Sequence, residues 1–119
     1  MLKLNRSETK KFVLKDIILV PYRDFYIVLN SSEILYVKAD KAYSKITMLN
    51  GKEYLVSKNL KLIQNMLPVN FIRTHNSYLI NVLHAVSFHK NSTFTLNNDQ
   101  VIPLSRRRKK YILELVNEM

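Results

Sequence analysis

Five consecutive cations at residues 106–110 (Arg-Arg-Arg-Lys-Lys) are the strongest chemical signal in this sequence. They directly follow Ser105, and the spacing of the apolar residues after them predicts a helix that begins there. Positive charges at a helix N-terminus oppose the helix dipole, and neighbouring cations repel one another unless an anion neutralises them. Arginine also has the planar fork that matches the O6 and N7 acceptors of guanine. The run therefore favours contact with DNA or RNA over a solvated helix start.

The stretch 71–81 interleaves apolar residues with polar ones that can point outward. Asn76 could pair with N6 and N7 of adenine, although the bare residue is better explained by a turn in which it bonds its own backbone. His75 could bind phosphate, but a half-buried histidine bonded to nearby backbone is the better explanation. Arg73 and Ser77 are open to both interpretations. The mixture indicates a rigid connector that presents side chains to a partner.

Seven tyrosines raise the alternative of an RNA-binding β module, in which aromatic rings stack on bases. Most of them lie at strand positions, where core packing explains them. Tyr43 differs because it follows a short loop, residues 40–42, from which it and Lys41 could reach outward together. For Tyr43 taken alone, contact with nucleic acid and a packing role are equally good explanations.

The charge balance, 19 Lys and Arg against 9 Asp and Glu, gives a net charge of +10 and favours an anionic partner, most often nucleic acid. Solubility alone is the simpler alternative, and a membrane surface would require a basic amphipathic helix that the sequence does not offer. The sequence has no apolar run long enough to span a bilayer and no pattern of a secretory signal. We therefore expect a cytoplasmic protein without a membrane partner.

The residue types also argue against catalysis, cofactors and metals. The lack of cysteine excludes disulfides and cysteine-ligated zinc, and His75, His84 and His89 match no zinc spacing. A single glycine excludes a glycine-rich phosphate loop. The carboxylates are scattered, and Ser77 and Ser105 lack the elbow that exposes a nucleophilic serine. We expect a binding protein that has no cofactor and no bound metal and is not an enzyme.

Many short strands and two short helices must position these residues, within one domain. Expected strands are residues 12–20 (ending at Pro21), a buried strand at 25–29, and others at 34–39, 43–49, 52–57, 85–89, 93–96 and 100–104. Asn50-Gly51 predicts a two-residue hairpin turn. Ser57 or Asn59 is expected to cap a short helix that ends before Pro68, with Leu60, Ile63, Met66 and Leu67 on its apolar side. The C-terminal helix is expected to have an apolar stripe of Tyr111, Ile112, Leu115 and Val116. The pattern predicts a mainly β architecture.

Three segments, in the right order and at the right spacing, resemble the LytTR DNA-binding domain family. Residues 71–81 resemble its signature F-x-R-x-H-x-S-[YF]-[LIV]-[VI]-N, and residues 102–107 resemble its closing I-P-[VL]-S-R-R. Residues 34–43 are similar to the I-x-Y-I-E-A-x-x-x-Y that opens the domain. The resemblance covers about residues 25–116. Asn76 stands where many members have Arg or Lys, and Lys38 where many have Glu, which implies a different target sequence.

The resemblance implies an elongated stack of small, mostly antiparallel sheets with two short helices, which inserts loops into successive major grooves of double-stranded DNA. Carried over residue by residue, it implies base contacts from Lys41, Tyr43, Asn76 and Arg107. The residues for which it implies support or contact with the DNA backbone are Arg73, His75, Ser77, Ser105, Arg106 and Lys110.

The sequence therefore predicts a sequence-specific, double-stranded DNA-binding transcription regulator, the output domain of a two-component response regulator. Residues 1–15 are expected to be a basic leader or linker remnant, and residues 16–119 the LytTR-like domain. An upstream receiver domain and a second copy on repeated sites are the expected protein partners. A stand-alone LytTR regulator and the RNA-binding module are the alternatives.

Overall fold

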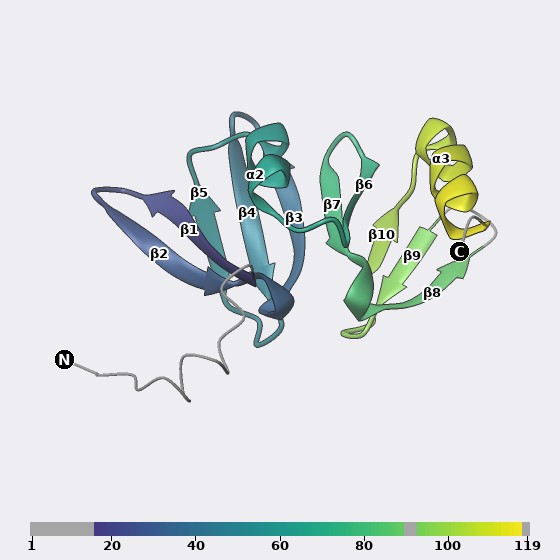
Figure 1. Cartoon of the computed structure of the whole chain (residues 1–119), viewed down its shortest axis with the longest axis horizontal. Coiled ribbons are helices and arrows are strands. Elements are labelled where there is room, and N and C mark those ends of the chain that lie inside the picture. The colour runs from purple at the N-terminus through teal and green to yellow at the C-terminus, as the bar shows by residue number, and fades with distance from the viewer. Residues whose placement is uncertain (1–15, 90–92, 118–119) are drawn as a thin grey trace.

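A computed structural model describes residues 16–89 and 93–117 of the chain, and the side chains of residues 16–89 and 93–114. Within these residues the strands form three antiparallel sheets, which lie side by side along the molecule (Figure 1). The predicted mainly β stack of small sheets is confirmed. The elements are β1 (Ile17–Tyr22), β2 (Phe25–Asn30), η2 (Ser31–Glu33), β3 (Ile34–Asp40), β4 (Tyr43–Met48), β5 (Glu53–Val56), α2 (Leu60–Met66), β6 (Phe71–His75), β7 (Tyr78–Asn81), η3 (Val82–His84), β8 (Ala85–His89), β9 (Thr93–Leu96), β10 (Val101–Pro103) and α3 (Arg106–Asn117).

The first sheet is the hairpin of β1 and β2, joined by a two-residue turn at Arg23-Asp24. Its inner face is buried, but Tyr26 and Val28 on the outer face of β2 are 65% and 64% exposed. The prediction of a buried strand at residues 25–29 is therefore right about the strand and wrong about its burial. A continuous apolar run has no alternation that would reveal the exposed face, and a two-stranded sheet packs on one face only.

Strand β1 also continues through Pro21, which pairs with Tyr26, so the predicted strand end at Pro21 is wrong. Proline lacks an N–H, but it is tolerated where a strand has no second neighbour to bond. Within the described residues β1 bonds only to β2. The predicted start of this strand, residues 12–15, lies outside the described residues.

The middle sheet has the strand order β5-β4-β3-β7-β6, with all neighbours antiparallel. The stretch 71–81 is a hairpin of β6 and β7 in this sheet, and not the rigid connector that the sequence indicated. Its apolar residues are built into two cores, because Leu79 and Ile80 point to opposite faces and are both fully buried. The hairpin thereby holds its turn, Asn76-Ser77, on a rigid base.

The turn between β4 and β5 is wider than the predicted two-residue hairpin. The N–H of Gly51 donates to the carbonyl of Met48 at 2.9 Å, and the N–H of Met48 donates to the carbonyl of Lys52 at 2.8 Å. Of the Asn50-Gly51 pair, only Gly51 has a positive φ, at 88°. The glycine was correctly placed in the turn, but a type I′ turn would need positive φ at both residues.

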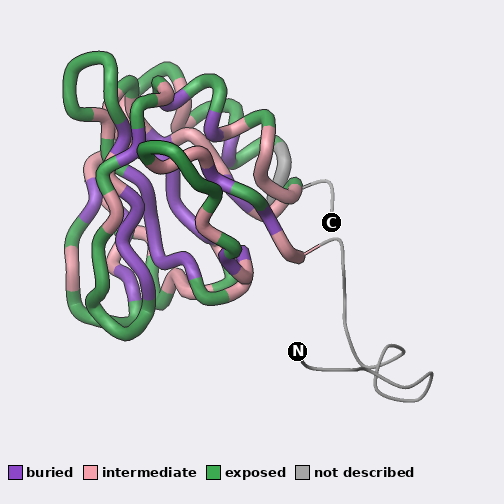
Figure 2. Tube along the Cα trace, turned by 90° about the vertical axis from the view of Figure 1, so that its left-hand side faces the viewer, coloured by how far each residue is buried: buried purple, intermediate pink, exposed green. Residues whose placement is uncertain are grey.

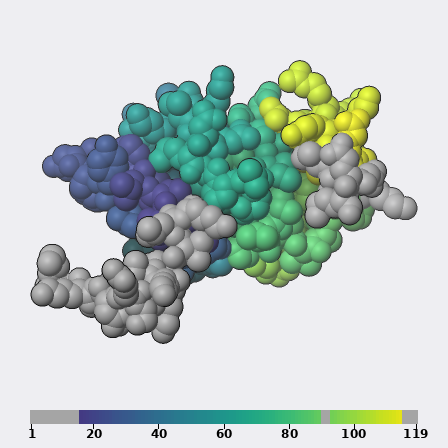
Figure 3. All heavy atoms as spheres, in the orientation of Figure 1, coloured from purple at the N-terminus to yellow at the C-terminus, as the bar shows by residue number. Residues whose placement is uncertain are grey.

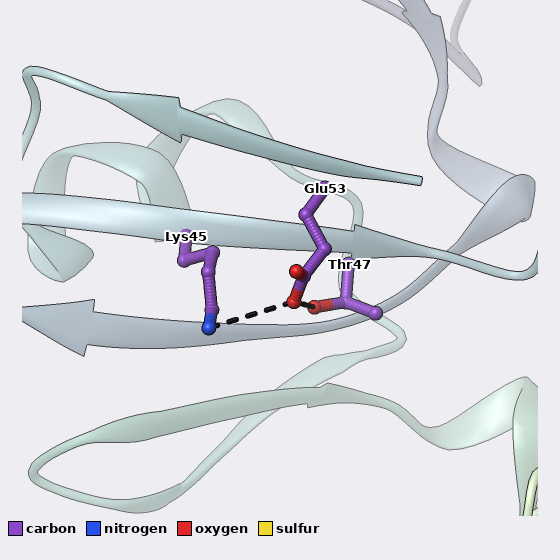
Figure 4. A network of polar contacts seen from close by, with 3 residues as sticks. All are labelled: Lys45, Thr47 and Glu53. Carbon is purple, nitrogen blue, oxygen red and sulfur yellow. Dashed lines mark hydrogen bonds and ion pairs between the residues drawn. The ribbon is translucent and has the colours of Figure 1, made fainter. Parts of the chain in front are cut away.

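The outer face of β4 and β5 carries a small polar network (Figure 4). Lys45 Nζ lies 3.5 Å from Glu53 Oε2, and the hydroxyl of Thr47 donates to the same oxygen at 3.4 Å. An exposed ion pair of this kind contributes roughly 0–1 kcal/mol. Its consequence here is electrostatic, because Glu53 offsets the charge of Lys45 on this face.

Helix α2 begins at the predicted cap Asn59, whose Oδ1 accepts from the N–H of Leu62 at 2.9 Å. Leu60 and Ile63 are buried against the middle sheet, as predicted. The Asn59→Ala variant should lower the free energy of unfolding by about 1 kcal/mol, because one helix N–H loses its acceptor. Urea unfolding checks this, and an unchanged midpoint would contradict the capping role. Ser57→Ala is the matched control and should leave the midpoint unchanged.

The third sheet, of order β10-β9-β8, leads into α3. Ile112 of α3 is buried as predicted, whereas Tyr111 is 59% exposed and does not belong to the packed stripe. The other two residues of the predicted stripe, Leu115 and Val116, have side chains that are not among those the structure describes. Two cores flank the middle sheet: one lies under α2 and the first sheet, and the other under the third sheet and α3. Figure 2 shows buried segments in the interior of the molecule and exposed segments at many of its turns. Strand β3 contributes to both, through Val37 and Tyr36 respectively.

Candidate nucleic-acid interface

The three segments that carry the candidate residues meet along one edge of the molecule, at the top of Figure 1. Because β3 and β7 are antiparallel neighbours, the end of β3 lies beside the start of β7. The N–H of Ala39 donates to the carbonyl of Ser77 at 2.8 Å, which joins β3 to the β6–β7 turn. The N–H of Ser105 donates to the carbonyl of Thr74 at 2.8 Å, which joins the start of α3 to β6.

Arg73 stabilises the backbone of the β6–β7 turn through hydrogen bonds from its side chain. Its Nε donates to the carbonyl of His75 at 3.0 Å, and its Nη2 donates to the carbonyl of Asn76 at 2.7 Å. The strand register shifts between Arg73 and His75, at the start of the turn that these bonds hold. The Asn76 backbone is thereby fixed while its carboxamide stays exposed. Arg73 is thus a clamp of the turn. The sequence left open whether Arg73 contacts a partner or bonds to nearby backbone, and the structure shows the bonds to the backbone.

The electrostatics of Arg73 favour an anion in its neighbourhood. Partial burial lowers the pKa of Arg73, and the nearby positive charge of Arg108 lowers it further. Both effects mean that the positive charge is less well solvated and less well compensated than on an open surface. A negative group placed between β6 and the start of α3 would offset this repulsion.

His75 is oriented by its own turn. Its Nδ1 accepts from the N–H of Ser77 at 3.1 Å, so the proton of the neutral ring is on Nε2. The ring also lies edge-on to Tyr78, with 6.2 Å between the ring centres. His75 therefore has the bond to nearby backbone that the sequence favoured, and it also keeps an Nε2–H donor for an acceptor outside the turn.

Ser105 caps α3. Its Oγ accepts from the N–H of Arg108 at 3.3 Å, and its carbonyl accepts from the N–H of Lys109 at 2.9 Å. The first turn of α3 contains no acidic residue. Arg106, Arg107 and Lys110 are exposed around this helix start.

A hollow of about 240 Å³ lies between the β6–β7 turn and the start of α3. The residues that line it are His75, Asn76, Ser105, Arg107 and Arg108. Two segments 30 residues apart in the sequence thus form one concave, positively charged site. Arg108 was not among the predicted residues, because nothing in a run of five cations distinguishes one from the next. Arg108 does follow Ser105 by the three residues that separate a serine cap from the N–H it accepts from, but this spacing concerns the backbone N–H and says nothing about the side chain.

The remaining candidates do not line this hollow. Lys41 is exposed at the tip of the β3–β4 turn with φ 57°, and Tyr43, the first residue of β4, is about half exposed. Arg73 and Ser77 support the β6–β7 turn, while Arg106 and Lys110 lie on α3 outside the hollow's lining. Asp40 is exposed beside Lys41 and reduces the local positive charge.

A mainly β chain that presents two hairpin turns and a basic helix start along one edge is a scaffold for binding, and its charge suits nucleic acid. Residues 24–117 match the model of the LytTr DNA-binding domain, and the chain belongs to this family. It is thus a LytTR-type DNA-binding domain.

One solved structure supports the fold independently. The LytTr DNA-binding domain of a protein described as a methyl-accepting/DNA response regulator from Bacillus cereus is 23% identical in sequence, with a TM-score of 0.70. The similarity covers 85% of this chain and 96% of that one. No curated protein shows a significant match to this sequence. None of the helices in residues 16–89 and 93–117 is both long enough and apolar enough to cross a membrane.

Proposed function

We propose that this chain is a sequence-specific, double-stranded DNA-binding transcription regulator. The observation that supports this most directly is the hollow shared by Asn76 and Arg107. These residue types recognise adenine and guanine in the major groove, and here they are brought to one place by two different elements. A site meant only for phosphates would not need an exposed carboxamide there.

The proposed mechanism divides the edge into base-reading and anchoring groups. The β6–β7 turn and the start of α3 enter one major groove, where Asn76 and Arg107 contact base edges. The β3–β4 turn brings Lys41 and Tyr43 to base edges in the next major groove, on the same face of the duplex. The groups that anchor or support this arrangement are Arg73, His75, Ser77, Ser105, Arg106 and Lys110.

The division of roles among the anchoring groups follows from their contacts. Arg106 and Lys110 are exposed cations suited to phosphates. The Nε2–H of His75 is a donor of the same kind. By contrast, the side chains of Arg73 and Ser105 make hydrogen bonds within the turn and the helix cap, and Ser77 is bonded within the turn through its backbone N–H. Affinity would come mainly from the cations and specificity mainly from Asn76 and Arg107.

We extend the proposal to the whole protein. Residues 16–119 would be the DNA-binding unit, and residues 1–15 a basic linker to an upstream receiver domain that makes the protein a two-component response regulator in the cytoplasm. A second copy on a repeated site would add affinity. A stand-alone regulator would have the same DNA site without the receiver, and neither form requires catalysis or a cofactor.

Selection from a pool of randomised DNA duplexes at near-physiological salt tests this function. We expect enrichment of a short motif, with spaced repeats if two copies bind together. Binding that appears only at low salt without an enriched motif would contradict sequence recognition. A parallel RNA pool serves as the control, because preference for single-stranded RNA would favour the tyrosine-stacking alternative.

A further inference from the structure

A second hollow, of about 420 Å³, lies between the tip of the β1–β2 hairpin, the start of β4 and the end of β5. The residues that line it are Tyr22, Arg23, Tyr43, Leu55 and Ser57. The hairpin forms one end of the molecule and α3 the other (Figure 3). Tyr43 connects this hollow to the proposed DNA-binding edge, because it directly follows the β3–β4 turn.

The lining has the chemistry of a site for a DNA backbone segment. Arg23 supplies a guanidinium group, and Tyr22, Tyr43 and Ser57 supply three hydroxyl groups. Arginine, tyrosine and serine are all used to bond phosphate oxygens and sugars in protein–DNA complexes. Leu55, about half exposed, adds an apolar surface against which a deoxyribose can pack.

Arg23 is placed for such a role. It is the only Lys or Arg between residues 16 and 37, and it occupies the tip of the hairpin with φ 57°. Its guanidinium lies 5.4 Å from the centre of the Tyr22 ring. The Tyr22 ring is itself held by Phe25 and Tyr54, at 5.6 and 6.4 Å between ring centres. The cation is thus presented on a packed aromatic platform.

We propose that this hollow binds a backbone phosphate of the duplex, next to the bases approached by Lys41 and Tyr43. The proposal rests on the DNA-binding function and extends the contact surface to a fourth element, the β1–β2 hairpin. The neighbouring carboxylate of Asp24 is exposed at the same tip and opposes an approaching phosphate. Arg23 and Asp24 should therefore affect DNA binding in opposite directions.

The test compares Arg23→Ala with Lys52→Ala. Lys52 is a matched control, because it is also an exposed cation at a hairpin turn stacked on a tyrosine, 5.8 Å from the centre of the Tyr54 ring. It lies at the opposite end of β5 from Ser57 and does not line the hollow. Affinity for a duplex that includes several base pairs beyond the recognised motif is measured by fluorescence anisotropy over a range of salt concentrations.

Loss of one phosphate contact lowers the slope of log affinity against log salt concentration by about one. We expect this change for Arg23→Ala, together with a roughly threefold to tenfold loss of affinity at physiological salt, and no change in slope for Lys52→Ala. Asp24→Asn should bind more tightly than the unsubstituted chain. Ethylation interference should show one flanking phosphate that matters for the unsubstituted chain and no longer matters for Arg23→Ala.

The proposal is overturned if Arg23→Ala keeps the full slope, or if Lys52→Ala loses as much as Arg23→Ala, because charge alone would then explain the effect. Both results leave the proposed DNA-binding function intact. If the unsubstituted chain does not bind duplex DNA at all, the proposed function and this phosphate site are both wrong.

Discussion

The Arg107→Ala variant should bind its preferred duplex about 1–3 kcal/mol more weakly, roughly 5-fold to 150-fold, and lose discrimination at one base pair. Arg107 is exposed and lines the same hollow as Asn76, so its fork is available to a guanine edge. Alanine removes this fork without disturbing a buried contact. Anisotropy titrations against the preferred duplex and its single-base variants measure both effects.

Lys110→Ala is the matched control for Arg107→Ala, because Lys110 is an exposed cation of the same helix but does not line the hollow. It should weaken binding to all sequences alike and lower the salt slope by about one. If Arg107→Ala shows this uniform loss and keeps its discrimination, Arg107 is a phosphate contact and the assignment of base reading is wrong.

The Arg73→Ala variant should lose both stability and DNA binding, although Arg73 need not touch DNA. Its two hydrogen bonds to the carbonyls of His75 and Asn76 hold the β6–β7 turn. Hydrogen bonds from a charged donor contribute a few kcal/mol at most. Removing Arg73 should cost less than this, because its side chain is partly exposed and because its loss relieves the repulsion from Arg108. We therefore expect the free energy of unfolding to fall by about 1–2 kcal/mol. A loosened turn should cost roughly tenfold or more in affinity for the preferred duplex.

The Arg73→Lys variant separates this clamping role from a direct charge contact. Lysine keeps the positive charge but cannot direct two donors at two carbonyls in the fixed geometry of a guanidinium. We expect Arg73→Lys to resemble Arg73→Ala in affinity and in urea unfolding, with the salt slope unchanged. Full rescue by lysine would show that Arg73 acts through its charge alone.

Much of the fold was readable from local patterns. The cap at Asn59, the glycine turn at Gly51 and the short β-rich segments are local signals, and they occur where the sequence indicated, although the turn is wider than predicted. Burial of β2 was not readable, because Phe25, Tyr26 and Val28 are apolar whichever face they occupy. Their exposure follows from the two-stranded form of the first sheet, which is a property of the assembled fold.

The candidate site was readable in its parts but not in its geometry. The basic run that contains Arg107 indicated nucleic acid, whereas Asn76 taken alone was better explained by a turn, and only the family resemblance implied base contacts from both residues. What joins them in space is the bond from Ser105 to Thr74, a contact between distant backbone groups that carries no side-chain signature. For the same reason the sequence could not distinguish the clamp Arg73 from an outward-facing arginine, or single out Arg108 within the basic run.

Hydroxyl-radical footprinting on a selected duplex tests the central claim, that one edge of this domain reads double-stranded DNA. Because the β3–β4 turn, the β6–β7 turn and the start of α3 lie along a single edge, we predict protection confined to one face of the duplex. The protected positions should recur at about one helical turn, roughly 10 base pairs. Protection that surrounds the duplex evenly, or that appears only on single strands, would contradict the account.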